Sequence, residues 1–193
     1  MTNMAEWLQP SPMLIVPLAP LWSLAVEEQV YLFWPVLLRL VKPERLPHAM
    51  ILLALASIAW RVATRFAGSP VQITYAWTPS NLEPFAAGAI VAWLARNRMD
   101  VLRNLSPRVL SASLFFMLGM AVGQRHFNFW QAPAAMLTIG MSATVWMFAS
   151  SIGCLVASRE RSWLNRFLSH PSLCMFGKYS YSIYVVHASV PQS

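Results

Sequence analysis

The segment PLAPLWSLAVEEQVYLFWPVLL, residues 17–38, joins a membrane-like apolar run to three polar side chains, Glu27, Glu28 and Gln29. Its proline-rich start is typical of a loop, and its remainder is typical of a membrane-spanning helix. An ionised carboxylate at the centre of such a helix costs about 2.5–3.5 kcal/mol on insertion scales. Ionisable residues in spans face the bundle interior or a water-filled cavity and mark functional sites. The segment therefore indicates both a fold class and a first candidate site.

The composition of the whole chain supports a polytopic membrane protein of the all-α class. The chain has 193 residues, of which 57% are hydrophobic and 11% are charged, whereas a soluble domain carries about 25% charged residues. The net charge of +7 resides in short connections between apolar runs, where membrane topology places basic residues. No polar segment interleaves aromatic and basic residues, so we expect no nucleic-acid partner. Cys154 and Cys174 lack metal-ligand or redox spacing, so we expect two small apolar fillers and no metal site.

The apolar runs predict about six transmembrane helices, each near the ~20 residues that cross a hydrocarbon core. Spans of this length are helices because backbone groups in lipid must be bonded internally. Prolines punctuate the connections, at 43, 47, 79, 107, 133 and 171. Small residues on the spans permit close helix approach; these are Ala54, Ala56, Ser57, Ala86, Ala87, Gly88, Gly119 and Gly123. The predicted spans are Leu21–Leu40, His48–Ala67, Leu82–Ala95, Arg108–Gly123, Pro133–Ala157 and a sixth that begins near Cys174.

Charge in the predicted connections alternates along the chain. The first, third and fifth connections are rich in Lys and Arg, and the second, residues 68–81, has no charge. By the positive-inside tendency the basic connections face the cytoplasm. The segment before Trp22 then faces outward, which predicts that Glu27 lies near the outer mouth of its helix.

Polar side chains of the first span fall on one face of the expected helix. Ser23, Glu27, Tyr31 and Trp34 are spaced four, four and three residues apart, and residues at such spacings share a face. We expect this stripe to face the bundle interior, with Glu28 to one side of it. In an alternative interpretation, Ser23 is an N-cap and the carboxylates only interact with the helix dipole in the first turn. That interpretation leaves Tyr31, a turn deeper, unexplained.

Three stretches resemble the acyltransferase 3 family of membrane enzymes that acylate carbohydrates. The family's W-S-L-x-x-E-x-x-x-Y pattern is met at Trp22, Ser23, Leu24, Glu27 and Tyr31. The stretch TPSNLEPFAAGAIVAWL, residues 78–94, resembles a later helix of the family, and GKYSYSIYVVH, residues 177–187, resembles its closing helix. Asn81 and Glu83 depart from this likeness, because the family usually has Arg and Asp there.

The resemblance also predicts that residues 1–193 are part of a larger domain. Family members begin with a helix bearing an Arg-x10-His motif, and no first-span match exists here; Arg159 and His170 have that spacing but lie in a polar connection. We therefore expect a partial acyltransferase 3 domain whose N-terminal helices are missing and whose last helix is truncated. As a fragment it is expected to be inactive.

The activity that the resemblance implies is transfer of an acyl group, acetyl above all, from acyl-CoA to a carbohydrate hydroxyl. Acetyl-CoA is then a co-substrate, with no bound cofactor, and the chain resides in the bilayer of a bacterial inner membrane. Glu27 is the candidate catalytic residue, which orients a base or bonds the acceptor hydroxyl. The candidate substrate-binding residues are Trp22, Ser23, Tyr31 and Glu28.

Two other functions stay open. In a transporter or permease fragment, Glu27 would lie on a proton or substrate path, but the sequence shows none of the internal repeats of transporters. A non-catalytic membrane subunit would use the carboxylates for packing alone.

The span arginine Arg61 is predicted to snorkel outward with Arg65, with a buried partner such as Glu83 as the alternative.

Overall fold

The computed structural model describes residues 21–70, 74, 76–127, 136–158 and 163–187. All the regular elements of this part are helical, which confirms the all-α prediction. The α-helices are α3 (Leu21–Leu40), α4 (Leu46–Phe66), α6 (Leu82–Asn97), α7 (Met99–Phe127), α9 (Met141–Ala157), α10 (Trp163–Leu168) and α11 (Pro171–His187). Two 3₁₀ turns, η1 (Pro43–Arg45) and η2 (Thr78–Asn81), and a π-helical turn, η4 (Met136–Gly140), complete the described elements.

Most helix bounds lie close to the predicted spans, and α3 has the predicted bounds. The largest difference concerns α7, which begins at Met99 and not at Arg108. Pro107 lies inside this helix, so its prediction as part of a connection is wrong. An apolar run marks the part of a helix that fits in lipid, and a helix extends beyond it wherever its polar end reaches water. The predicted start of the fifth span at Pro133 falls outside the described residues.

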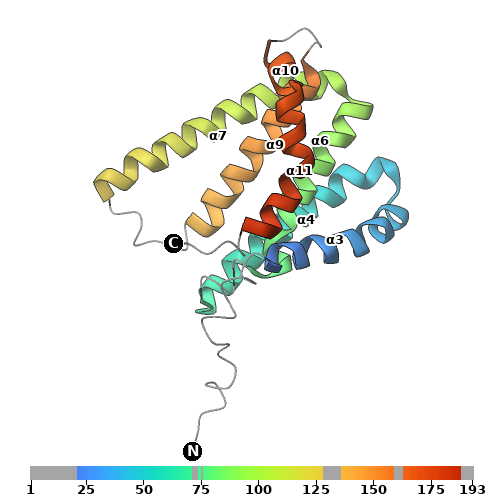
Figure 1. Ribbon diagram of the computed structural model, residues 1–193. Coiled ribbons are helices and arrows are strands. Elements are labelled where there is room, and N and C mark those ends of the chain that lie inside the picture. Colours follow the sequence, from blue (N-terminus) through green and yellow to red (C-terminus); the bar gives the residue numbers. More distant parts are fainter. Residues whose placement is uncertain (1–20, 71–73, 75, 128–135, 159–162, 188–193) are drawn as a thin grey trace, which may run out of the picture.

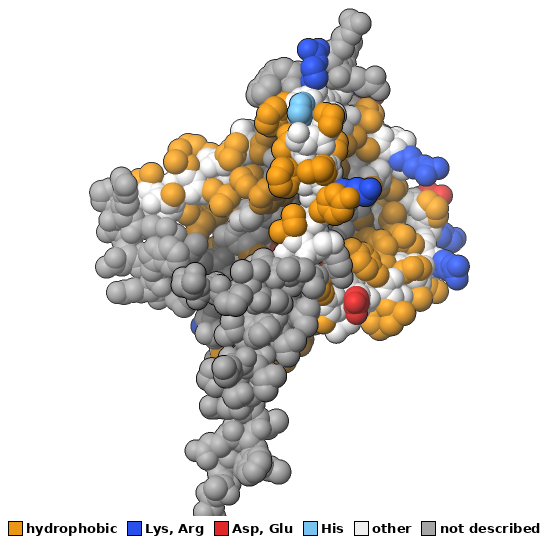
Figure 2. All heavy atoms as spheres, in the orientation of Figure 1, with side chains coloured by type: hydrophobic (Ala, Val, Ile, Leu, Met, Phe, Trp, Pro, Cys, Tyr) orange, Lys and Arg blue, Asp and Glu red, His pale blue; other side chains and the backbone are white. Residues whose placement is uncertain are grey.

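Three helical segments of the described part are long and apolar enough to cross a membrane. They are Pro43–Phe66, Met99–Gly123 and Thr138–Ala157. Only 11–22% of each apolar window is buried inside the protein. Large apolar side chains are therefore exposed along these helices, for example Phe66 at 89% and Phe115 at 79%. Figure 2 shows hydrophobic side chains over most of the described surface in view, as expected for a surface that faces lipid.

The helices pack in the order α4, α6, α9, α7, and α7 runs beside α9 (Figure 1). Small side chains permit these contacts, as predicted for Ala54 and Ala86, which pack with Met50 in the core cluster. The prediction is wrong for Gly88, Gly119 and Gly123, because a Cβ at any of these positions would have nothing within 4 Å. The close approach of α7 to α9 depends instead on Gly153, where a Cβ would lie 3.2 Å from the Cβ of Ser106.

Candidate active site

The face of α3 that packs on the rest of the protein is apolar. Val26 and Val30 are each only 5% exposed. Ser23 and Glu27 lie half-buried at the edge of this packed face. Tyr31 lies further round the helix and is 64% exposed, so the prediction that the whole polar stripe faces the bundle is wrong for Tyr31. Val26 and Val30 occupy the packed face instead, where van der Waals packing holds membrane helices together.

The other predicted binding residues of α3 are placed differently. Glu28 is exposed, on the side of the helix away from the packed face. The side chain of Trp22 lies outside the described residues. The structure thus places Ser23 and Glu27, one helical turn apart, beside the packed face, and it leaves Glu28 and Tyr31 outside that face.

Ser23 connects the first motif of the chain to the last. Its Oγ lies 2.6 Å from the hydroxyl oxygen of Tyr184 on α11, and either group can be the donor. The two residues are 161 positions apart in the sequence. Tyr184 belongs to the stretch 177–187 that resembles the closing helix of the family. The fold therefore brings two separately recognised motifs together, next to the half-buried Glu27.

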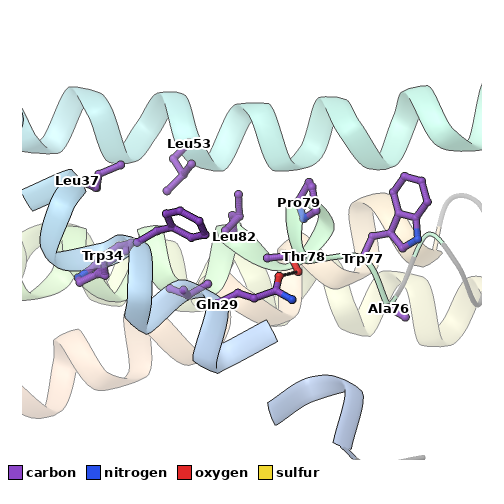
Figure 3. Close-up of a pocket in the computed structure, with 11 residues that line it drawn as sticks. Gln29, Trp34, Leu37, Leu53, Ala76, Trp77, Thr78, Pro79 and Leu82 are labelled. Atoms are coloured by element: carbon purple, nitrogen blue, oxygen red, sulfur yellow. Dashed lines mark hydrogen bonds between the residues drawn. The ribbon is translucent and has the colours of Figure 1, made fainter. Parts of the chain in front are cut away.

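A groove of about 640 Å³ lies on the neighbouring side of α3, between α3, α4 and the η2 turn. In Figure 3, Leu37, Leu53 and Trp77 border this space. The polar side chains of its lining include Thr78, whose hydroxyl donates to Oε1 of Gln29 over 2.6 Å. Glu27, Ser23 and Tyr31 are not among the residues that line the groove. Of the predicted polar stripe, only Trp34 lines the groove, together with Gln29 of the same helix.

A buried ion pair joins α4 to α6. Arg61 on α4 donates from Nη2 to Oε2 of Glu83 on α6, and both side chains are fully buried. The prediction that Arg61 snorkels outward is therefore wrong, and the alternative pairing with Glu83 is the observed one. A buried charge is stable only when it is paired and hydrogen-bonded, and the partner lies within the bundle. Arg65, one turn on, is half-buried and donates to the carbonyl of Ser69 over 2.5 Å.

Further hydrogen bonds reach both members of the pair, and of the polar atoms of these two side chains only Nε of Arg61 has no partner among the described residues. Ser142 on α9 donates to Oε2 of Glu83 over 2.9 Å, and the indole of Trp146 donates to Oε1 over 3.0 Å. Arg61 also donates from Nη1 to the carbonyl of Ser80 in η2 over 2.9 Å. One charged cluster thus joins α4, η2, α6 and α9. The sequence signals for it were Arg61 inside one apolar span and Glu83 near the start of another.

The chemistry available near α3 comes from two hydroxyls and one carboxylate. A hydroxyl both donates and accepts hydrogen bonds, so Ser23 and Tyr184 have the functional groups to hold a carbonyl oxygen or a sugar hydroxyl. A carboxylate accepts hydrogen bonds and shares or takes a proton. Glu27 supplies that group one turn from Ser23. Such a set suits acid–base chemistry on a hydroxyl.

A bundle of apolar helices that closes around a buried ion pair and exposes hydrophobic side chains defines an integral membrane protein of the all-α class. The chain belongs to the acyltransferase 3 family. The family model, described as an acyltransferase domain, matches residues 5–190.

Similar curated proteins are named O-acetyltransferases. The chain is 28% identical over 180 residues to the O-acetyltransferase OatA of Staphylococcus aureus (strain NCTC 8325 / PS 47), which covers 90% of this chain and 29% of that protein. It is 30% identical over 187 residues to the peptidoglycan O-acetyltransferase OatA of Listeria monocytogenes serovar 1/2a, which covers 89% of this chain and 28% of that protein. The chain thus spans less than a third of the length of these relatives. No solved structure matches it significantly.

Proposed function

We propose that this chain is the motif-bearing part of a membrane O-acetyltransferase that moves an acetyl group from acetyl-CoA to a carbohydrate hydroxyl. The observation that carries the proposal is the 2.6 Å contact between Ser23 and Tyr184. It joins the opening and closing motifs beside Glu27. Membership of the family and the names of its O-acetyltransferase relatives support acyl transfer as the reaction class.

In the proposed reaction a carbon–oxygen and a sulfur–hydrogen bond form, while a carbon–sulfur and an oxygen–hydrogen bond break. The acceptor oxygen attacks the acetyl carbonyl carbon, and the carbon–sulfur bond of the thioester breaks. The hydroxyl proton must leave as the new bond forms, because a neutral sugar hydroxyl is a poor nucleophile. Glu27 accepts the hydrogen bond of this hydroxyl and takes its proton as the carbon–oxygen bond forms. The departing thiolate takes up a proton as CoA leaves.

In this proposal Ser23 and Tyr184 hold the acetyl donor. Either hydroxyl can donate to the thioester carbonyl oxygen, on which negative charge develops in the transition state. Donors placed in advance at such an oxygen account for much of the catalysis of acyl transfer. Because Ser23 and Glu27 share one face of α3, donor and acceptor would meet at one end of this helix.

We also propose a bacterial inner membrane as the location and a cell-envelope carbohydrate as the acceptor. The name of the Listeria relative specifies peptidoglycan, and this supports a glycan of the same compartment. The helices long and apolar enough to cross a bilayer, with their exposed hydrophobic side chains, support a membrane location.

The test uses the full-length protein that contains this chain, in membrane vesicles with radiolabelled acetyl-CoA and purified peptidoglycan. We expect labelled acetyl esters on the glycan, and losses of about tenfold or more in Ser23→Ala and in Tyr184→Phe, in line with removal of one transition-state donor. Since the two hydroxyls act as one unit, the double variant should lose little more than either single variant. Ser182→Ala, an exposed residue of the same helix α11, is the matched control. Full activity in both single variants would contradict the role of the hydroxyl pair, and no transfer by the wild type would contradict the reaction class.

A further inference from the structure

We infer that Arg61 is a positioning residue, which fixes the α3 motif through the η2 turn. The inference rests on the proposed function of α3, but its structural part can be tested separately. Arg61 is 0% exposed and lies on a different helix from every residue of the motif. Its role would be to hold η2 in place, so that η2 in turn holds α3.

The first link runs from Arg61 to η2. The carbonyl oxygen of Ser80 accepts from Nη1 of Arg61 over 2.9 Å and from Oγ of Ser57 over 3.0 Å. Arg61 cannot turn away from this carbonyl freely, because its Nη2 is held by Glu83 and donates to Ser142 over 2.8 Å. The planar guanidinium thus donates to three acceptors, which fix its orientation.

The second link runs from η2 to α3. Thr78 lies two residues before Ser80 and donates to Gln29 over 2.6 Å, and Figure 3 shows the two side chains meeting among the residues that line the groove. Thr78 and Ser80 lie in one turn, which is closed by the hydrogen bond from the Ser80 amide to the Trp77 carbonyl over 3.0 Å. Gln29 is two residues from Glu27 on α3. A shift of η2 would therefore move the helix segment that bears the candidate catalytic carboxylate.

Two aromatic contacts show what would hold α3 and η2 if Arg61 were lost. Trp34 contacts Phe85 with ring centroids 6.4 Å apart, nearer the other end of α3. Trp77 contacts Trp60 of α4 with centroids 5.6 Å apart, which gives η2 a second attachment to α4. We therefore expect that loss of Arg61 displaces the Gln29 end of α3 without detaching the helix.

The decisive variant is the charge exchange Arg61→Glu with Glu83→Arg. It keeps an ion pair between α4 and α6, so a role in helix packing alone would be restored. It does not restore the donor to the Ser80 carbonyl, because a carboxylate at position 61 has no proton to give. The two acceptor oxygens then repel each other. Arg65→Met is the matched control, since Arg65 lies one turn away on α4 and bonds Ser69 instead.

The position of α3 is read by crosslinking Phe33→Cys on α3 to Leu53→Cys on α4 with a bifunctional thiol reagent, in a background whose other cysteines are replaced; both positions line the groove, and the Thr78–Gln29 bond stays in place. We expect crosslinking in the charge-exchange variant to slow by about tenfold or more, the factor that equals ~1.4 kcal/mol. Acetyl transfer, measured without the added cysteines, should lose about tenfold or more in kcat with little change in KM, because displacement of a catalytic group raises the barrier without weakening binding. The Arg65→Met control should keep both.

The result that overturns the inference is wild-type crosslinking and kcat in the exchanged pair. If the exchange variant fails to reach the membrane, Arg61→Lys serves instead, because it keeps the charge and loses the two-pronged geometry. Slower crosslinking in folded Arg61→Lys supports the inference, and unchanged crosslinking overturns it. Absence of acetyl transfer in the wild type would refute the proposed function alone, since crosslinking needs no substrate.

Discussion

Replacement of Glu83 by Gln should strongly destabilise the protein. The carboxylate accepts hydrogen bonds from Arg61, from Ser142 over 2.9 Å and from Trp146 over 3.0 Å. The substitution leaves the fully buried guanidinium without its counter-ion and turns an amide NH₂ toward it. Removal of one partner of a buried ion pair costs about 3–5 kcal/mol. Against a total stability of about 5–15 kcal/mol, this lowers the ratio of folded to unfolded protein by about two to four orders of magnitude.

The assay is unfolding of purified protein in detergent micelles, followed by tryptophan fluorescence as denaturant is added. Glu44→Gln is the control, because Glu44 is an exposed acid in η1 and its replacement should leave the midpoint nearly unchanged. The reasoning fails if Glu83→Gln unfolds at the wild-type midpoint with the wild-type slope. It also fails if both variants lose the same stability, since burial would then have no role.

Three further stability predictions use the same unfolding assay. Gly153→Ala should cost about 1–3 kcal/mol through overpacking, because the added Cβ would meet Ser106; Ser106→Gly should recover part of this loss, and equal stability of Gly153→Ala and wild type would refute the close α7–α9 contact. Trp146→Phe should cost about 1.5–3 kcal/mol through loss of a donor to the charged Glu83, and a loss as large as that of Glu83→Gln would contradict this ranking. Gly68→Ala should cost about 1–2 kcal/mol, since Gly68 has φ 76°; no change in the midpoint would show that the turn relaxes.

The sequence predicts the helices well because apolar runs and helix bounds share a physical cause. The run at Leu21–Leu40 gave α3 its bounds, since lipid demands internal backbone bonding over that length. The same reasoning from apolar runs failed at the start of α7, because the polar residues after Met99 continue the helix beyond the lipid. Hydropathy records the solvent around a helix and carries no information on where its polar end stops.

The site could be predicted only in part, because pairing depends on which helices are neighbours. The motif residues Ser23 and Glu27 were found from spacing and resemblance. Their partner Tyr184 was recognised only as part of a motif, since no local pattern places α11 beside α3. In the same way, Arg61 was expected to reach outward because the position of Glu83 on the adjacent helix is a tertiary fact. The rotation of α3, which exposes Tyr31, was set by the two buried valines and not by its polar stripe.

The most direct measurement of the central claim is acetyl transfer by Glu27→Gln in the full-length protein, at matched abundance in membrane vesicles. The amide keeps the size of the side chain and removes its negative charge. The account predicts that activity falls by about 100-fold or more, the range of a lost acid–base group, whereas Glu44→Gln stays near wild type. Activity of Glu27→Gln within twofold of wild type would contradict the claim that the half-buried carboxylate of Glu27 takes part in acetyl transfer.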